Sequence, residues 1–159
     1  MVEICDKNGN VLSRVYAESL AGAELSGEAL AGALLTGADL SKAQLARIEL
    51  GGADLSRANL SGAILTRADL HNADLRGANL RGAKLAHANL SGANLSGADL
   101  KGADLEETDL SDARHDSSTS WPDGYQAAVS HRPTQKKAGC ATVLLATFAA
   151  VVLIWLLLG

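Results

Sequence analysis

Few side chains in this sequence are of the kinds that carry out enzyme chemistry. There are four histidines and two cysteines: His71, His87, His115, His131, Cys5 and Cys140. No histidine has partners at the spacing of a metal-ligand set, and neither cysteine has a neighbouring histidine to activate it. The chain also lacks a phosphate-binding loop and a dinucleotide fingerprint. We therefore predict no catalytic, cofactor-binding or metal-binding residues, and a protein that is not an enzyme.

The many acidic residues and glycines belong to a repeat. Leucine occupies every fifth position from Leu20 to Leu110, 19 times in succession. Alanine stands two residues before the leucine in 15 units, Asp or Asn lies between them in 11, and glycine follows two residues after it in 11. Because Asp, Asn and Gly all tolerate turns, we expect these residues to serve the backbone.

A period of five fits neither common secondary structure. On an α-helix, leucines five apart lie about 140° from one another, and on a flat strand they alternate between faces. Within one unit, however, Ala and Leu are two residues apart, so both side chains can point the same way. A square coil of four units, about 20 residues per turn, lets every Ala and Leu point inward and stack on the next coil.

The units resemble the A-(D/N)-L-x-x consensus of the pentapeptide repeat family, as in residues 68–72 (ADLHN) and 98–102 (ADLKG). The resemblance covers about 95 of the 159 residues. It implies an all-β solenoid, a right-handed quadrilateral β-helix, which we expect over residues 20–113. The handedness comes from the resemblance and not from the spacing.

An N-terminal cap is expected over residues 1–19, because the start of a β-helix is an open sheet edge. Residues 2–5 and 11–16 have the composition of short strands, and the Asn8-Gly9 pair between them favours a hairpin. A flexible leader is the alternative. Glu18 and Glu28 stand where alanine should point inward, and since a buried carboxylate is costly, we expect the backbone to bulge or splay there.

The repeat register ends after Asp112, and a C-terminal cap is expected over residues 114–125. Residues 121–125 (WPDGY) resemble the W-P-(D/E)-G-(F/Y) element that often follows the last coil in the same family. Trp121 and Tyr125 are suited to cover the open end of the leucine stack, and an aromatic ligand site is the alternative. Residues 126–137 have the composition of a polar linker.

Residues 138–159 contain no charged side chain. As a helix these 22 residues would reach about 33 Å, enough to cross a bilayer core of about 30 Å. Lys136 and Lys137 precede the run and are expected to stay cytoplasmic. We predict a C-terminal transmembrane tail anchor in the bacterial inner membrane, with the N-terminal domain in the cytoplasm. A buried soluble helix is the alternative.

Residues 20 apart should stack in columns, which segregates charge on the surface. One side is predicted to be acidic and another partly basic, although ordinary solvated surface is the alternative. The candidate interaction residues are Glu49, Asp69 and Asp109 in an acidic column, Arg47 and Arg67 in a basic column that His87 continues, and the stacked pair Arg81 and Lys101.

Two functions from different classes follow. The first is a non-catalytic, membrane-tethered protein-interaction scaffold or accessory subunit. Its expected partners are the lipid bilayer, through residues 138–159, and a protein such as another membrane protein. Nucleic acid is not an expected partner. The alternative rests on the family resemblance, because some pentapeptide repeat proteins are fluoroquinolone-resistance factors that imitate duplex DNA and bind DNA gyrase. Here the acidic column is short and the central residue is always leucine, whereas those proteins are usually rich in phenylalanine at that position.

Overall fold

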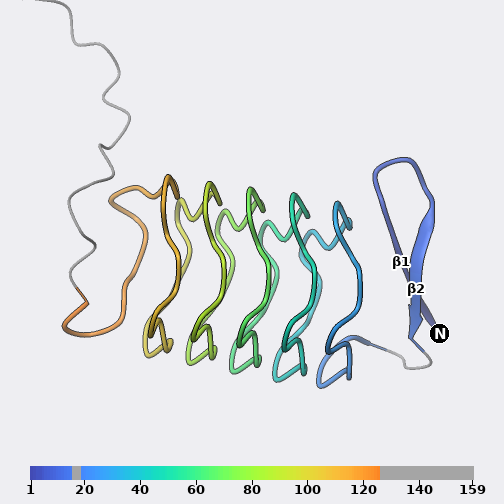
Figure 1. Ribbon diagram of the computed structural model, residues 1–159, viewed down its shortest axis with the longest axis horizontal. Coiled ribbons are helices and arrows are strands. Elements are labelled where there is room, and N and C mark those ends of the chain that lie inside the picture. Colours follow the sequence, from blue (N-terminus) through green and yellow to red (C-terminus); the bar gives the residue numbers. More distant parts are fainter. Residues whose placement is uncertain (16–18, 126–159) are drawn as a thin grey trace, which may run out of the picture.

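The computed structural model describes residues 1–15 and 19–125. They form a two-stranded hairpin followed by a stack of coils of nearly equal size (Figure 1). Within the described residues, no helix combines the length and the apolar character needed to cross a membrane. The predicted linker over 126–137 and the predicted transmembrane segment over 138–159 lie outside the described residues.

Each coil has four sides and takes 20 residues, as the spacing predicted. Parallel β-bridges join residues 20 apart on every side, so the outward residues of successive coils form four columns. We name each side after its member in the second or third coil. The columns are Glu24, Gln44, Ile64, Lys84 and Asp104 (the Gln44 side); Ala29, Glu49, Asp69, Asn89 and Asp109 (the Glu49 side); Leu34, Asp54, Asp74, Asn94 and Arg114 (the Asp54 side); and Asp39, Asn59, Asn79, Asp99 and Ser120 (the Asn59 side).

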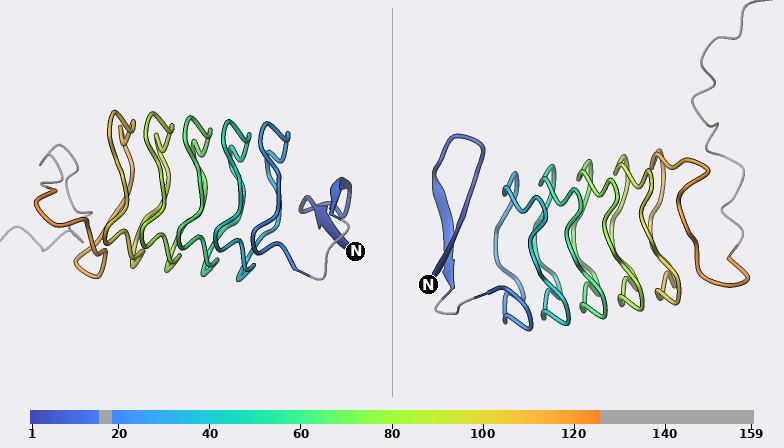
Figure 2. Two further views of the ribbon diagram at one scale, coloured as in Figure 1. Left: turned by 90° about the horizontal axis from the view of Figure 1, so that it is seen from below. Right: turned by 180° about the vertical axis from the view of Figure 1, so that it is seen from behind.

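Backbone hydrogen bonds between coils hold the stack together. On the Glu49 side, Leu50 N–H donates to the Asp69 carbonyl of the next coil at 2.7 Å, and Asp69 N–H donates back to the Ile48 carbonyl at 2.9 Å. The same pair of bonds recurs on the other sides, so the N–H groups of the inner coils, apart from the residue directly after each leucine, are paired between coils or within a corner. Figure 2 shows the coils running side by side in the same order from two further directions.

Every corner between two sides is a tight turn. In all 19 units the N–H three residues after the leucine donates to the leucine carbonyl, as from Ala53 to Leu50 at 3.0 Å. The residue just before that donor has positive φ in every unit, for example 66° at Gly52. Such a turn requires a left-handed residue at its third position, which explains the 11 glycines of the repeat. The other eight units place a non-glycine residue there: Lys42, Arg47, Arg57, Arg67, Asn72, His87, Glu107 and Asp112.

The core is a column of leucines and alanines with almost no solvent contact. Every repeat leucine from Leu40 to Leu100 is at most 1% exposed, and Ile48 packs at an alanine position with 1% exposure. The backbone bulge that the sequence predicted at Glu28 is not observed. Glu28 keeps the regular turn bond to Leu25, and its carbonyl accepts from Glu49 N–H at 2.9 Å. The burial of its carboxylate is avoided as expected, because the side chain is exposed in the first coil. Glu18 lies outside the described residues.

The N-terminal hairpin, β1 (Val2–Cys5) and β2 (Val11–Val15), packs on the first coil. The strands pair antiparallel, with a bulge between Ile4 and Cys5, and a five-residue loop that contains Asn8 and Gly9 joins them. The Cys5 carbonyl accepts from Leu34 N–H at 2.8 Å, a bond that a preceding coil would otherwise provide. Ile4 is 2% exposed and joins the leucine core. The predicted strand residue Tyr16 lies outside the described residues.

At the other end the ladder of β-bridges continues past Asp112 into the predicted C-terminal cap. Asn94 bridges to Arg114, and Asp99 bridges to Ser120, one residue later than the regular spacing. The side chain of Thr119 sits at an alanine position and donates to the Leu95 carbonyl at 2.9 Å. Trp121 packs against the leucine core and stacks on Tyr125, with ring centroids 5.1 Å apart. These two aromatic rings lie at the C-terminal end of the leucine stack.

The stability of the stack is predicted to depend on interior leucines more than on terminal ones. Leu60→Ala leaves a cavity in a close-packed column and should lower the free energy of unfolding by about 2–5 kcal/mol. Leu105→Ala removes a side chain that is only half-buried in the last coil and should cost less. Urea unfolding of both variants measures the difference, and equal losses would contradict a core that is tighter in the middle than at its end.

Candidate interaction surfaces

The outward Asp and Asn side chains of the repeat are first of all turn residues. In all 11 units that contain one, its Oδ1 accepts the backbone N–H two residues later, as in the 2.9 Å bond from Ser56 N–H to Asp54. These bonds fix the entry into each corner. The sequence predicted that these positions serve turns, and the hydrogen bonds give the mechanism.

The same bonds shift the pKa values of several of these carboxyls. The Ser56 hydroxyl donates to Asp54 at 2.6 Å and lowers the pKa of Asp54. The Arg76 guanidinium lies 2.6 Å from Asp74 and lowers the pKa of that carboxyl in the same direction. Hydrogen bonds from Ser111 lower the pKa of Asp109, which is one of the predicted interaction residues. The charged form of these side chains is therefore part of the folded structure.

The predicted acidic column is assembled on the Glu49 side. Glu49, Asp69 and Asp109 stack with Asn89 between the last two, as the 20-residue register requires. Asp69 already has two side-chain partners, because Asn89 Nδ2 donates to it at 3.1 Å and His71 Nδ1 lies 2.9 Å from it. This leaves Glu49 and Asp109, which lie three coils apart in the column, as the more open carboxylates.

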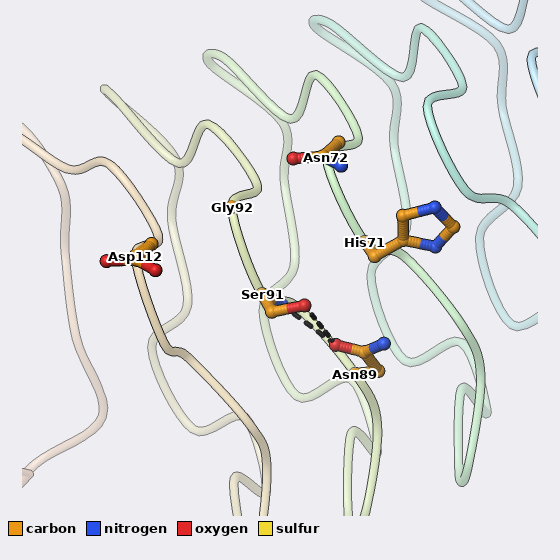
Figure 3. Close-up of a pocket in the computed structure, with 6 residues that line it drawn as sticks. All are labelled: His71, Asn72, Asn89, Ser91, Gly92 and Asp112. Carbon is orange, nitrogen blue, oxygen red and sulfur yellow. Dashed lines mark hydrogen bonds between the residues drawn. The ribbon is translucent and has the colours of Figure 1, made fainter.

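An open hollow of about 490 Å³ lies beside the Glu49 side. Its lining is polar and comprises His71, Asn72, Asn89, Ser91, Gly92 and Asp112 (Figure 3). The His71 ring turns away from Ser91 and lies over Gly51 of the preceding coil, where a Cβ atom would collide with it. The Ser91 hydroxyl donates instead to Asn89 at 2.7 Å. His71 is paired with Asp69 and the Ser91 hydroxyl with Asn89, so the hollow contains no serine activated by a histidine.

The predicted basic column is assembled at the corner between the Gln44 and Glu49 sides. Arg47 and Arg67 occupy the left-handed turn position in successive coils, and His87 follows in the next. His87 Nδ1 lies 2.9 Å from a Glu107 carboxylate oxygen in the last coil, so this end of the column has its own acidic partner. Arg47 and Arg67 are exposed, and no described residue forms an ion pair with either.

The predicted pair Arg81 and Lys101 stacks at the opposite corner of the Gln44 side. The coil-to-coil bond from Gly82 N–H to the Lys101 carbonyl, 3.0 Å long, places the two residues in adjacent coils. Arg81 is 3.0 Å from Asp99 and is thus paired. Sequence reasoning did not select Lys42, which precedes this pair at the same corner. The 20-residue register would have found it, because it places Lys42 level with Arg47 across one side of the coil.

No other arrangement with chemical capability appears in the part of the chain that the structure describes. Within residues 1–15 and 19–125, no three His, Cys, Asp or Glu side chains are grouped so as to hold a metal ion. Lys136 and Lys137, predicted to flank the membrane, lie outside this part.

The chain belongs to the pentapeptide repeat family. The family model "Pentapeptide repeats" matches eight copies, over residues 19–52, 43–82 and 73–112. Proteins of this family form right-handed quadrilateral β-helices, which agrees with the four-sided coils and confirms the predicted fold of the repeat region. A search of curated proteins found no match.

Solved structures of the same family are similar to this chain. A pentapeptide repeat protein, Rfr23, from the cyanobacterium Cyanothece 51142 is 35% identical over 75% of this chain and 78% of its own, with a TM-score of 0.41. The protein alr5209 from Nostoc Pcc 7120 is 36% identical over 55% of this chain and 77% of its own, with a TM-score of 0.51. QnrB1, a plasmid-mediated fluoroquinolone resistance protein, is 17% identical over 58% of each chain, with a TM-score of 0.38, and shares the fold alone.

The turn carboxylates predict that the protein loses stability in acid. An Asp whose pKa is lowered on folding binds fewer protons in the folded state, so its contribution is complete above the unfolded value of about 3.9 and is lost as pH falls through the folded value. Thermal unfolding followed by circular dichroism should therefore give a melting temperature that is level near neutral pH and falls below about pH 4.

Substitution at Asp54 separates hydrogen bonding from charge. Asp54→Ala removes the acceptor of Ser56 and should cost about 1 kcal/mol near neutral pH. Asp54→Asn keeps an Oδ1 acceptor, as Asn59 does in the next unit, and should cost less while reducing the acid sensitivity. If the Ala and Asn variants lose stability equally near neutral pH, the turn bond is not what Asp54 provides.

Proposed function

We propose that this protein is a non-catalytic protein-interaction scaffold or accessory subunit, held at the cytoplasmic face of the bacterial inner membrane by residues 138–159. The observation that carries the interaction part is the segregation of charge on flat, rigid sides. Carboxylates stack on the Glu49 side, and unpaired cations flank the Gln44 side. A solenoid of this kind offers extended surfaces to a partner without having to change shape.

Two hollows among residues 1–15 and 19–125 are open and lined by polar side chains, one by His71 and its neighbours and one by Thr36, Ser56, Arg57 and Arg76. Small-molecule sites are usually concave and largely apolar, so neither hollow resembles one. The partner in this proposal is a protein.

The tether rests on the sequence. Residues 138–159 carry no charge and are long enough to span a bilayer as a helix, and Lys136 and Lys137 precede them. A linker of about 12 residues would let the β-helix reach roughly 20 Å from the membrane. The proposed partner therefore lies close to the inner leaflet and is itself a membrane protein or bound to one.

No specific feature of the described surface favours the alternative function, gyrase binding by DNA mimicry. A DNA mimic needs a long, regular array of free carboxylates, whereas Asn89 interrupts the column on the Glu49 side and Asp69 is bonded to His71 and Asn89. A supercoiling assay with this protein tests the alternative, and inhibition at micromolar concentration would revive it.

Deletion of the apolar tail tests the tether. A chain ending at residue 137 should leave the membrane fraction, because the span is gone, and should keep its melting temperature, because the leucine core lies within residues 1–125. Carbonate-washed membranes and thermal unfolding measure the two properties. Retention of the truncated chain in washed membranes would contradict the tether.

A tail exchange distinguishes a free tether from an accessory subunit. Replacement of residues 138–159 by an unrelated single-span helix should restore membrane recruitment in both cases. Recovery of function in the host would indicate a simple tether, while loss of function despite recruitment would indicate that the helix itself contacts a partner, as small and polar residues in a span allow.

A further inference from the structure

The middle of the Gln44 side carries an excess of positive charge. Residues 41–48, 61–68 and 81–88, which form this side and its corners in three successive coils, contain five Lys or Arg and no Asp or Glu. Of the five, only Arg81 has a carboxylate partner, Asp99. We call the other four, together with Ile64 at their centre, the cationic strip: Lys42, Arg47, Arg67 and Lys84, all exposed.

The strip is kept positive although carboxylates are plentiful on the same β-helix. Arg76 pairs with Asp74, Arg81 with Asp99 and His87 with Glu107, so the repeat readily provides acidic partners. None of the four strip cations forms an ion pair with a described residue. Arg47 and Arg67 stack in adjacent coils, about 5 Å apart along the stack, and Lys42 and Lys84 lie within the same three coils. These like charges repel one another and are better accommodated when a partner supplies negative charge.

Three of the four cations also occupy unfavourable backbone positions. Lys42, Arg47 and Arg67 have φ of 56°, 58° and 60°, at the turn position where 11 other units have glycine. The left-handed region is energetically unfavourable for a residue other than glycine. Residues held in unfavourable backbone conformations occur more often at functional sites than elsewhere. At these corners the chain has long cationic side chains where glycine would suit the turn better.

The length of the strip decides what kind of anion it fits. Along the same side the strip is bounded by Glu24 in the first coil and by Asp104 in the last, with Glu106 near the latter. Each boundary lies about 10 Å from Ile64, within one Debye length at moderate salt. A bilayer or a nucleic-acid duplex extends past both boundaries and meets these carboxylates, whereas a short acidic segment does not.

The centre of the strip is a second reason to expect a peptide as the ligand and not a nucleic acid. Ile64 is half-buried, points outward and is bridged to Gln44 and Lys84 on either side, so the cations surround an apolar contact. Within the described residues of this side there is no aromatic side chain on which a base could stack. The backbone donors here are used between coils, which leaves charge and the Ile64 surface as the means of recognition.

We propose that the cationic strip binds a short, acidic, extended protein segment that carries one apolar side chain for Ile64. This inference deepens the proposed scaffold function, on which it rests, by giving the chemistry of the partner. A segment of about six residues, near 20 Å long when extended, covers the three coils and the side between the two corners.

The test uses the full-length protein in neutral-detergent micelles. The probe is a labelled peptide of about eight residues, alternating Asp and Glu around a central leucine, and fluorescence anisotropy at about 50 mM salt reports binding. The key variant is Lys42→Gly/Arg47→Gly/Arg67→Gly, which removes three cations and installs the residue that the turns favour. Its melting temperature should equal or exceed that of the wild type, and its affinity should fall about tenfold or more.

A matched control separates charge on the strip from charge elsewhere. Arg57→Gly makes the same turn change at φ 59°, but at the corner between the Asp54 and Asn59 sides, and should leave peptide affinity within about twofold. Ile64→Asp should weaken binding at least as much as the loss of one cation. Equal peptide affinity of the wild type and the triple glycine variant, or no binding by the wild type, overturns the proposal.

Two further probes test whether the cationic strip binds an extended polyanion instead of a short acidic peptide. Vesicles of phosphatidylcholine with about a third phosphatidylglycerol, and a short DNA duplex, should bind no better to wild type than to the triple glycine variant. Strip-dependent binding to either, without peptide binding, overturns the proposal in favour of an extended polyanion. Membrane fractionation of the same variant should be unchanged, so a failure of the tether is distinguished from a failure of the strip.

Discussion

The fold depends on a single requirement, that the backbone turn by a quarter every five residues and still hydrogen-bond to the coil on either side. The turn needs a left-handed residue at each corner, and all 19 units have one. Once the corners are in place, each side contributes bonds such as Leu50 N–H to Asp69 O, and the alanine and leucine of each unit point inward. Core packing, column formation and surface charge all follow from this geometry.

The corners also show which surface residues are evidence for a binding site. Glycine meets the conformational requirement without adding a side chain, so most corners are bare. Where the chain has Lys42, Arg47 or Arg67 instead, the backbone is less favourable, and the side chain is the only gain that these residues offer. The acidic residues are different, because Asp54 or Asp109 accepts a turn hydrogen bond and so has a structural reason to be present. Cations at corners are therefore better evidence for a binding surface than carboxylates on sides.

The two ends of the stack are covered by different means. At the start, the Cys5 carbonyl replaces the missing coil for Leu34, and Ile4 closes the leucine column. At the other end, a threonine takes the place of alanine, and Trp121 with Tyr125 lies over the last coils. Both arrangements reduce the exposed sheet edge that a solenoid would otherwise present to other chains.

The sequence by itself determined the repeat, the four-sided coil, the inward residues and the stacked columns of Glu49, Asp69 and Asp109, because a strict period leaves one geometry that buries every leucine. It did not determine which charged residues are already paired, since the pairs of Arg81 with Asp99 and of His87 with Glu107 depend on rotamers across coils, and the pair of His71 with Asp69 depends on rotamers within one coil. It also did not determine that Glu28 keeps the regular turn bond with its side chain exposed, or that the ladder continues past Asp112 with one extra residue before Ser120 absorbed in a loop. Periodicity fixes the interior of a solenoid, while its ends and the pairing of its surface charges are settled only by the three-dimensional contacts.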